Sequence, residues 1–186
     1  MAHPIARKPL DRPQLRDMAL AYVGRYATTR AKLASYLGRK LRERGWADSE
    51  TPEALAVEAI VAAMVANHFV DDRAYADMKA QGMTRRGYGP RRVQHALSAA
   101  GIEAEDMDDA LAGARQDQEA AAIAFAKRRR IGPFSREVPD QKQREKAFAA
   151  MLRAGHDYAV ARRILDLPPE LVHTIGSGLD EEGCAS

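Results

Sequence analysis

The sequence has a single cysteine, Cys184, and few aromatic residues. Aromatics make up 6% of the 186 residues, and only one of them is tryptophan. A single cysteine excludes both a disulfide framework and a cysteine-based metal site within one chain. Hydrophobic residues nevertheless reach 46%, and many of them are alanine. Because alanine favours helices and lets their backbones approach closely, this composition favours closely packed helices.

Long hydrophobic runs are also missing. The longest run covers residues 59–66, which is far too short to cross a bilayer as a helix. The first residues, MAHPIARKPLDRP, lack the apolar core of a signal peptide. We therefore expect a cytoplasmic protein that does not contact a membrane and that keeps its one cysteine reduced.

Strand signals are scarce as well. Few segments alternate with period two, and no β-branched run lies between hairpin turns, so the fold class is predicted to be all-α. Helix starts are indicated by possible caps at Thr28 or Thr29 and at Asp157, and by Thr51 followed by a proline. Asp71 and Asp72 are both explained as caps of one further helix.

One helix pattern recurs three times. In each instance apolar residues lie eight and four positions before a glycine that can end the helix in the left-handed conformation. We therefore predict an elongated array of three tandem three-helix repeats at residues 13–70, 71–114 and 115–168. A flexible basic arm is expected at residues 1–12, and an acidic, disordered tail at 169–186. The recurring positions are Leu37, Leu41 and Gly45, then Val93, Leu97 and Gly101, then Ala147, Met151 and Gly155.

The third helix of the first repeat carries the most apolar sequence of the chain. Its periodicity predicts a buried face that includes Leu55, Ala59, Ala66 and Phe69. Either Ala62 or Ala63 completes that predicted face. We therefore expect these side chains to lie in the core of the first repeat.

The sequence lacks the residue constellations of enzymes. Gly87 and Gly89 begin a dinucleotide-binding pattern, but its third glycine would fall at Arg92, and a helix precedes it rather than a strand. No phosphate loop of the GxxxxGK[ST] type occurs, and the five histidines are far apart. The acidic stretch 103–109 lacks the spacing and glycine of a calcium loop. We expect no catalytic residue, no metal and no cofactor.

Positive charge is the remaining functional signal. The net charge is only +3, but basic blocks at 1–50, 71–100 and 121–163 alternate with acidic blocks at 51–70, 101–120 and 164–186. Three arginine-rich clusters could bind nucleic-acid phosphates or the acidic surface of a protein partner. The first cluster surrounds a turn shaped by Gly87, Gly89 and Pro90. The clusters are Arg85, Arg86, Tyr88, Arg91 and Arg92; Lys127, Arg128, Arg129 and Arg130; and Arg39, Lys40, Arg42 and Arg44.

Two stretches resemble the signature of the RecX family. They are FVDDRAYA at residues 69–76 and RGYGPRRV at residues 86–93, and weaker similarity extends over residues 13–167. The resemblance implies three three-helix units and a regulator of the RecA recombinase that binds the RecA–DNA filament. It further implies inhibition of the ATPase, strand-exchange and co-protease activities in recombination, DNA repair and the SOS response. The expected molecule is a monomer that touches DNA phosphates weakly or through the filament.

Other interpretations stay open on the residues alone. The basic helical faces also suit a DNA-binding protein that acts without RecA, or a repeat scaffold for a different protein. The resemblance does not decide which cluster touches RecA and which touches DNA.

Overall fold

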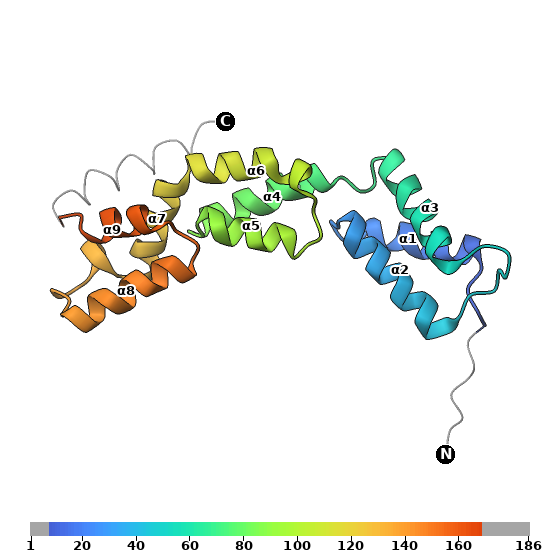
Figure 1. The fold of residues 1–186 in the computed structure, drawn as a ribbon, viewed down its shortest axis with the longest axis horizontal. Helices are drawn as coiled ribbons and strands as arrows, with labels where there is room; N and C mark the ends of the chain where they lie inside the picture. The colour runs from blue at the N-terminus through green and yellow to red at the C-terminus, as the bar shows by residue number, and fades with distance from the viewer. Residues whose placement is uncertain (1–7, 169–186) are drawn as a thin grey trace, which may run out of the picture. The chain divides into compact units, whose positions relative to one another are not determined.

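The computed structural model describes residues 8–168, and within them the regular structure is helical apart from one isolated β-bridge between Leu10 and Trp46. The predicted all-α class is confirmed. A 3₁₀ turn at Gly132–Phe134 interrupts the loop before α8. The nine α-helices of the described residues, labelled in Figure 1, are α1 (Arg12–Val23), α2 (Arg30–Arg44), α3 (Glu53–Ala66), α4 (Asp72–Arg85), α5 (Pro90–Ser98), α6 (Ala104–Gln116), α7 (Gln118–Arg129), α8 (Gln141–Arg153) and α9 (Tyr158–Leu165).

The described chain divides into two compact units. The first takes the chain as far as Ala76 together with Ser98–Met107, and the second takes Asp77–Leu97 together with the described chain from Asp108 onward. The first unit therefore includes a segment that follows α5 in sequence.

The core of the first unit is aliphatic. Leu33, Leu37 and Leu41 form one buried stripe on α2. They pack with Leu15 and Ala19 of α1, and Ile60 and Met64 of α3 belong to the same cluster. Thr29, one of the two predicted caps, caps α2, because its hydroxyl accepts a hydrogen bond from the Lys32 backbone N–H at 3.2 Å. Burial of this leucine stripe is the main force that holds the unit together.

The buried face of α3 was predicted wrongly. Leu55 and Phe69 are 56% and 55% exposed, and Ala59, Ala62, Ala63 and Ala66 are exposed as well. The residues that enter the core are Ala56, Ile60 and Met64. Because this helix is apolar on almost every side, the spacing of its hydrophobic residues does not indicate which face is buried. Packing against α2 determines that face.

The core of the second unit gathers α7, α8 and α9. It contains Phe125 of α7, Met151 of α8, and Val160 and Ile164 of α9, with Tyr88 packed against it. Val93 and Leu97 of α5 are also fully buried, as their spacing predicted. The turn that carries Tyr88 therefore contacts the core of the last three helices.

The flexible basic arm predicted for residues 1–12 is contradicted at residues 8–12. Leu10 is completely buried, and its backbone exchanges hydrogen bonds with Gly45 and Ala47. Asp11 caps α1 in a reciprocal capping box with Gln14. Residues 8–12 thus belong to the folded first unit, since Leu10 fills a place in its core. Residues 1–7 and the predicted tail at 169–186 lie outside the described residues.

Candidate functional site

The glycine turn at residues 87–90 is buried inside the second unit. A Cβ atom on Gly89 would lie 2.3 Å from the carbonyl oxygen of Gly155. Gly87 has a φ of 77°, and a Cβ there would lie 2.7 Å from the Phe125 backbone nitrogen. These positions accept only glycine because backbone meets backbone. The predicted shaping role of both glycines therefore has a concrete cause, which is close packing against α7 and against the turn after α8.

Hydrogen bonds join the two turns. The Gly89 N–H donates to the Ala154 carbonyl at 2.9 Å, and the Arg91 N–H donates to the Gly155 carbonyl at 3.2 Å. The buried His156 ring places Nε2 3.1 Å from the Gly87 carbonyl, a geometry in which Nε2–H donates. Burial lowers the pKa of His156, while the Gly87 carbonyl and the Asp157 charge oppose that shift. The neutral histidine therefore supports the turn through its hydrogen bond to Gly87.

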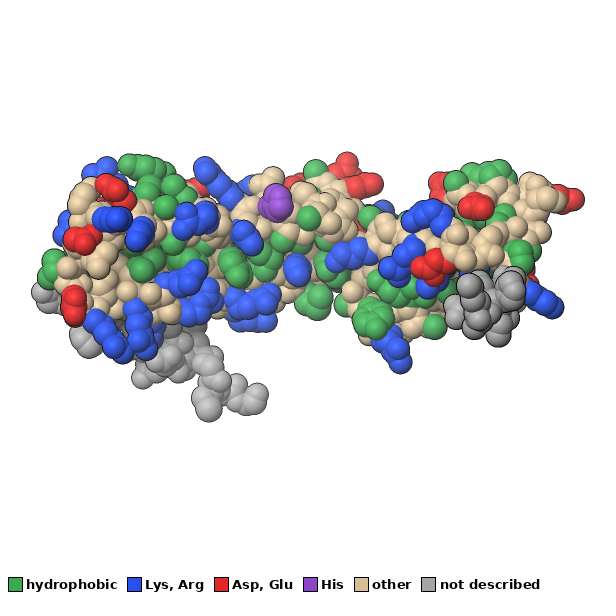
Figure 2. All heavy atoms as spheres, turned by 90° about the horizontal axis from the view of Figure 1, so that it is seen from below, with side chains coloured by type: hydrophobic (Ala, Val, Ile, Leu, Met, Phe, Trp, Pro, Cys, Tyr) green, Lys and Arg blue, Asp and Glu red, His purple; other side chains and the backbone are tan. Residues whose placement is uncertain are grey.

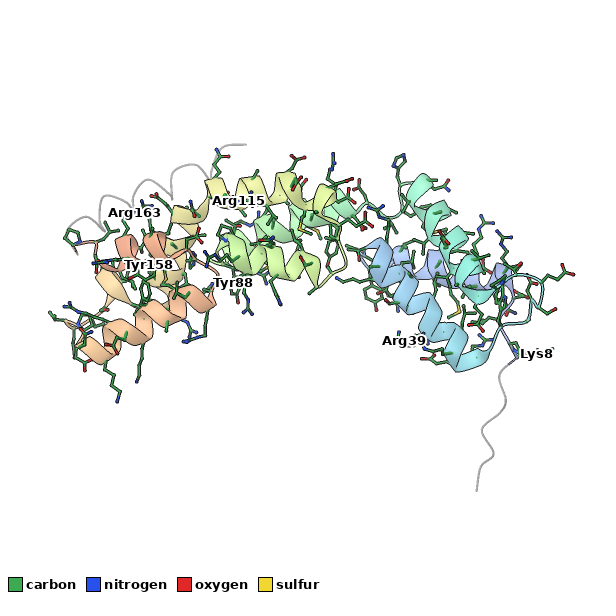
Figure 3. All side chains as sticks on the ribbon, viewed as in Figure 1. Lys8, Arg39, Tyr88, Arg115, Tyr158 and Arg163 are labelled. Atoms are coloured by element: carbon green, nitrogen blue, oxygen red, sulfur yellow. The ribbon has the colours of Figure 1, made fainter. Side chains whose placement is uncertain are left out.

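The four arginines of the turn are exposed around this buried backbone. Arg91 forms an ion pair with Asp157 at 2.8 Å, and the Arg92 guanidinium lies 5.7 Å from the centre of the Tyr88 ring. Asp157 occupies the predicted cap position of α9, but its side chain makes no capping bond. Its carboxylate faces Arg91 instead. Tyr88 is half-buried and lies at the start of α5, beside the end of α8 (Figure 3).

The second predicted cluster meets the first. The Arg128 guanidinium donates to the Arg86 carbonyl. Arg128 and Arg129 also lie 5.7 and 5.8 Å from the centre of the Phe125 ring. Lys127 and Arg130 are exposed at the same end of α7. We call the combined set the arginine surface: Arg85, Arg86, Tyr88, Arg91, Arg92, Lys127, Arg128, Arg129 and Arg130.

Positive charge dominates much of this unit. On the face shown in Figure 2, Lys and Arg side chains crowd the left-hand part of the molecule, where α7, α8 and α9 lie. Apolar side chains appear between them. Such a mixture can attract phosphates and also contact the flat faces of bases or a protein surface.

The third predicted cluster belongs to the first unit and is partly paired. Arg39 and Lys40 both face Glu43, at 3.7 and 2.6 Å. Arg44 donates to the Lys8 carbonyl at 3.0 Å. Arg42 is exposed on the same helix. The four residues thus lie on the same helix, α2, but differ in whether an ion pair or a hydrogen bond already engages their charged group.

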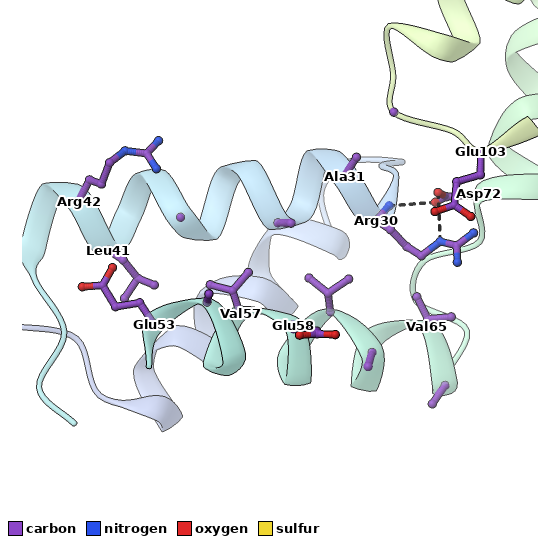
Figure 4. Close-up of a pocket in the computed structure, with 17 residues that line it drawn as sticks. Arg30, Ala31, Leu41, Arg42, Glu53, Val57, Glu58, Val65, Asp72 and Glu103 are labelled. Atoms are coloured by element: carbon purple, nitrogen blue, oxygen red, sulfur yellow. Dashed lines mark hydrogen bonds and ion pairs between the residues drawn. The ribbon is translucent and has the colours of Figure 1, made fainter. Parts of the chain in front are cut away.

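Asp72 has a role that its sequence position did not reveal. Only Asp71 caps α4, accepting from the Ala74 N–H at 2.9 Å. Asp72 is buried and accepts from the Arg30 backbone N–H at 2.9 Å and from Arg30 Nε at 3.2 Å (Figure 4). This bond to Asp72 is the main cause of the raised pKa of Arg30. The prediction that both aspartates are caps is wrong for Asp72.

Further contacts tie the same end of α2 to residues 98–107. The Thr29 hydroxyl donates to the Ala100 carbonyl at 2.7 Å, and Arg30 also forms an ion pair with Asp106. A Cβ atom on Gly101 would lie 2.3 Å from the Ala31 Cβ. Sequence reasoning missed these contacts. The one available signal was the doubled aspartate at 71–72, since one helix end needs only one cap.

No group of three or more His, Cys, Asp or Glu side chains within residues 8–168 is arranged to hold a metal ion. No helix there is long and apolar enough to span a membrane. Fold and surface together define a helical protein with basic and aromatic side chains exposed on its surface.

Comparisons with known proteins identify the family. The family model for "RecX, second three-helix domain" matches residues 71–111. The chain is 35% identical over 160 residues to the regulatory protein RecX of Myxococcus xanthus (strain DK1622), covering 83% of this chain and 86% of the relative. It is 28% identical over 156 residues to that of Agrobacterium fabrum (strain C58 / ATCC 33970), covering 83% of each chain. The chain belongs to the RecX family of regulatory proteins.

Solved structures show the same fold. A crystal structure of a regulatory protein RecX matches with a TM-score of 0.63 and 25% identity, covering 84% of this chain and 74% of that one. The crystal structure of RecX from Lactobacillus salivarius matches with a TM-score of 0.64 and 18% identity, covering 88% of this chain and 97% of that one.

Proposed function

We propose that this protein binds the RecA–DNA filament and inhibits its ATPase, strand-exchange and co-protease activities. The family supports a regulatory role, since the curated relatives are named regulatory proteins. The observation that carries the proposal is the arginine surface, where two clusters distant in sequence meet around one turn. A filament offers both of the chemical partners that such a surface suits, namely DNA phosphates and protein carboxylates.

We further propose that the nine helices form three three-helix units, α1–α3, α4–α6 and α7–α9. The match of residues 71–111 to a second three-helix domain supports this division. The separate hydrophobic clusters of α1–α3 and α7–α9 support it as well. Units in tandem would let one monomer touch neighbouring protomers of a filament.

Inhibition of this kind needs no reacting group. A protein that binds one filament conformation more tightly than another shifts the balance between them by that difference in affinity. A tenfold preference corresponds to about 1.4 kcal/mol, which a few well-placed arginine contacts can supply. The turn contributes by fixing where its arginines emerge, because its backbone is held by the hydrogen bonds to residues 154 and 155.

The direct test is RecA ATPase on single-stranded DNA with the protein added below RecA in concentration. We expect wild type to inhibit, and the quadruple variant Arg85→Ala, Arg86→Ala, Arg91→Ala, Arg92→Ala to inhibit at least tenfold more weakly. The matched control removes four exposed cations of the same unit, Arg136, Lys142, Lys146 and Arg153. Circular dichroism should show unchanged helicity for both variants.

Two outcomes would contradict the proposal. If the wild-type protein had no effect on the RecA ATPase over a wide concentration range, the filament would not be its partner. Equal inhibition by the quadruple variant and wild type would remove the arginine surface as the site. Tight, salt-dependent binding to DNA without RecA, together with no effect on RecA, would favour the alternative of a RecA-independent DNA-binding protein.

A further inference from the structure

A polar groove lies in the first unit, along α2. It has a volume of about 470 Å³, and its wall includes Tyr22, Tyr36 and the short segment 98–101. Three cations, Lys32, Arg39 and Arg42, line it together with the hydroxyls of Ser35 and Ser98. Among the described residues that line it, none is an aspartate or a glutamate. The groove therefore suits an anionic ligand.

Aromatic rings are stacked beside these cations. The rings of Tyr22 and Tyr36 lie almost parallel, with centres 4.2 Å apart, and Tyr26 lies 5.3 Å from Tyr22. Tyr22 and Tyr36 also pack against the aliphatic core, which fixes their orientation. Tyr26 is 53% exposed. The Tyr26 ring is tilted by 50° from Tyr22 and lies next to the residues that line the groove rather than among them. Its exposed face gives a planar ligand a surface beside the fixed Tyr22–Tyr36 pair.

The cations differ in how freely they can meet a ligand. Lys32 is anchored, with Nζ 2.6 Å from the Tyr75 hydroxyl. The Arg39 side chain is 59% exposed, its ion pair with Glu43 spans 3.7 Å, and its guanidinium lies 5.7 Å from the Tyr36 ring centre. An exposed ion pair of this length contributes little stability, so a phosphate can replace it.

The opposite side of α2 is less favourable for the same ligand. There a groove of about 940 Å³ between α2 and α3 is lined mainly by apolar residues, with the carboxylates of Glu53, Glu58, Asp72 and Glu103 against the cations of Arg30 and Arg42 (Figure 4). The carboxylates outnumber the cations there, so the net charge of this groove disfavours an anion. The two sides of α2 thus differ in charge, and an anionic chain is directed to the tyrosine side.

We propose that this tyrosine groove binds single-stranded nucleic acid, with a base stacked on Tyr26 and phosphates at Arg39 and Arg42. An acidic peptide could satisfy the cations but would leave the exposed ring face unused. A nucleotide uses both features, because every base offers a flat π-face and every link a phosphate. The inference rests on the nucleic-acid part of the proposed function and does not require RecA.

The test is binding of the full chain to a fluorescent oligo-dT, measured by anisotropy over a salt series without RecA. We expect Tyr26→Ala to weaken binding about fivefold or more, since a stacked base contributes on that scale. Tyr26→Phe should bind like wild type, because it keeps the ring. Binding to an abasic oligomer of equal length should not change between these variants.

The double variant Arg39→Ala, Arg42→Ala should weaken binding to both oligomers. For this variant, the slope of log K against log salt concentration should be smaller in magnitude by about 1.4, since each lost phosphate contact on a single strand removes about 0.7. The matched control is Arg16→Ala, Arg73→Ala, which removes two exposed arginines of the same unit that do not line the groove. We expect that control to keep the wild-type slope.

The proposal would be overturned if Tyr26→Ala and the double variant bound oligo-dT like wild type. It would also be overturned if poly-glutamate of equal charge displaced oligo-dT, with its own binding lost in the double variant, since the groove would then recognise acidic protein. Neither outcome bears on RecA inhibition through the arginine surface, so failure here and failure of the proposed function are distinguishable.

Discussion

Replacing Gly89 with alanine is the sharpest test of the buried turn. The new Cβ would lie 2.3 Å from the Gly155 carbonyl oxygen and 2.5 Å from the His156 nitrogen. Both are backbone atoms, so no flexible side chain can move aside, and the two turns must separate by roughly 1 Å to reach ordinary contact.

That separation would break three hydrogen bonds between the turns. They are the bonds from the Gly89 N–H to Ala154, from the Arg91 N–H to Gly155, and from His156 Nε2 to Gly87. At about 1 kcal/mol net for each bond, the loss is about 3 kcal/mol before any strain is counted. Since domains of this size are stable by about 5–15 kcal/mol, the effect should be large.

Urea denaturation followed by circular dichroism measures this loss. The control is Gly113→Ala on α6, where an added Cβ meets nothing within 4 Å. Because glycine in a helix is less stable than alanine by about 0.5–1 kcal/mol, that control should be neutral or stabilising. A free energy of unfolding for Gly89→Ala within about 0.5 kcal/mol of wild type would refute the packing argument.

Three further predictions concern stability and use the same urea denaturation. Asp72→Ala should cost about 2–4 kcal/mol, because it removes a buried, charged acceptor, whereas Asp71→Ala loses only a cap of about 1 kcal/mol; equal losses would contradict the distinct roles. Burial lowers the pKa of His156 below its ordinary 6.5, so the unfolded chain binds that proton first. Stability should therefore fall as the pH drops below about 6.5, and His156→Gln should flatten this dependence between pH 5.5 and 7; an unchanged slope would contradict it. Leu55→Ser should change stability by less than about 0.5 kcal/mol, and Ile60→Ala should cost about 2–4 kcal/mol; the reverse order would restore the face first predicted for α3.

The sequence was most informative where a local signal determines the structure. The leucine spacing on α2 and the threonine before it act within one or two turns of helix, and the structure agrees with both. The glycine that follows, Gly45, has a φ of 83°, a conformation that favours glycine locally. Signals of this kind predicted the helical class and several helix boundaries.

The sequence was least informative where the tertiary environment decides. The nearly uniform apolar surface of α3 left its buried face open. Asp72 resembled a second cap because its partner, Arg30, lies 42 positions earlier in the chain. The tyrosine groove brings residue 22 together with residues 98–101, a proximity that no local pattern contains. Its arginines were predicted as a cluster, but the aromatic platform beside them was not.

The first unit is built from two separate segments of the chain, and this affects how the chain folds during synthesis. The aliphatic core of α1–α3 needs nothing beyond Val70, yet Arg30 and Thr29 find Asp106 and Ala100 only after residue 107 has been made. At about 5–20 residues per second, the ribosome needs roughly 2–7 s for that interval. During this time the start of α2 exposes a cation and a hydroxyl without these partners. The nascent first unit is therefore a folded intermediate with one unfinished end, which residues 98–107 of the same unit later complete.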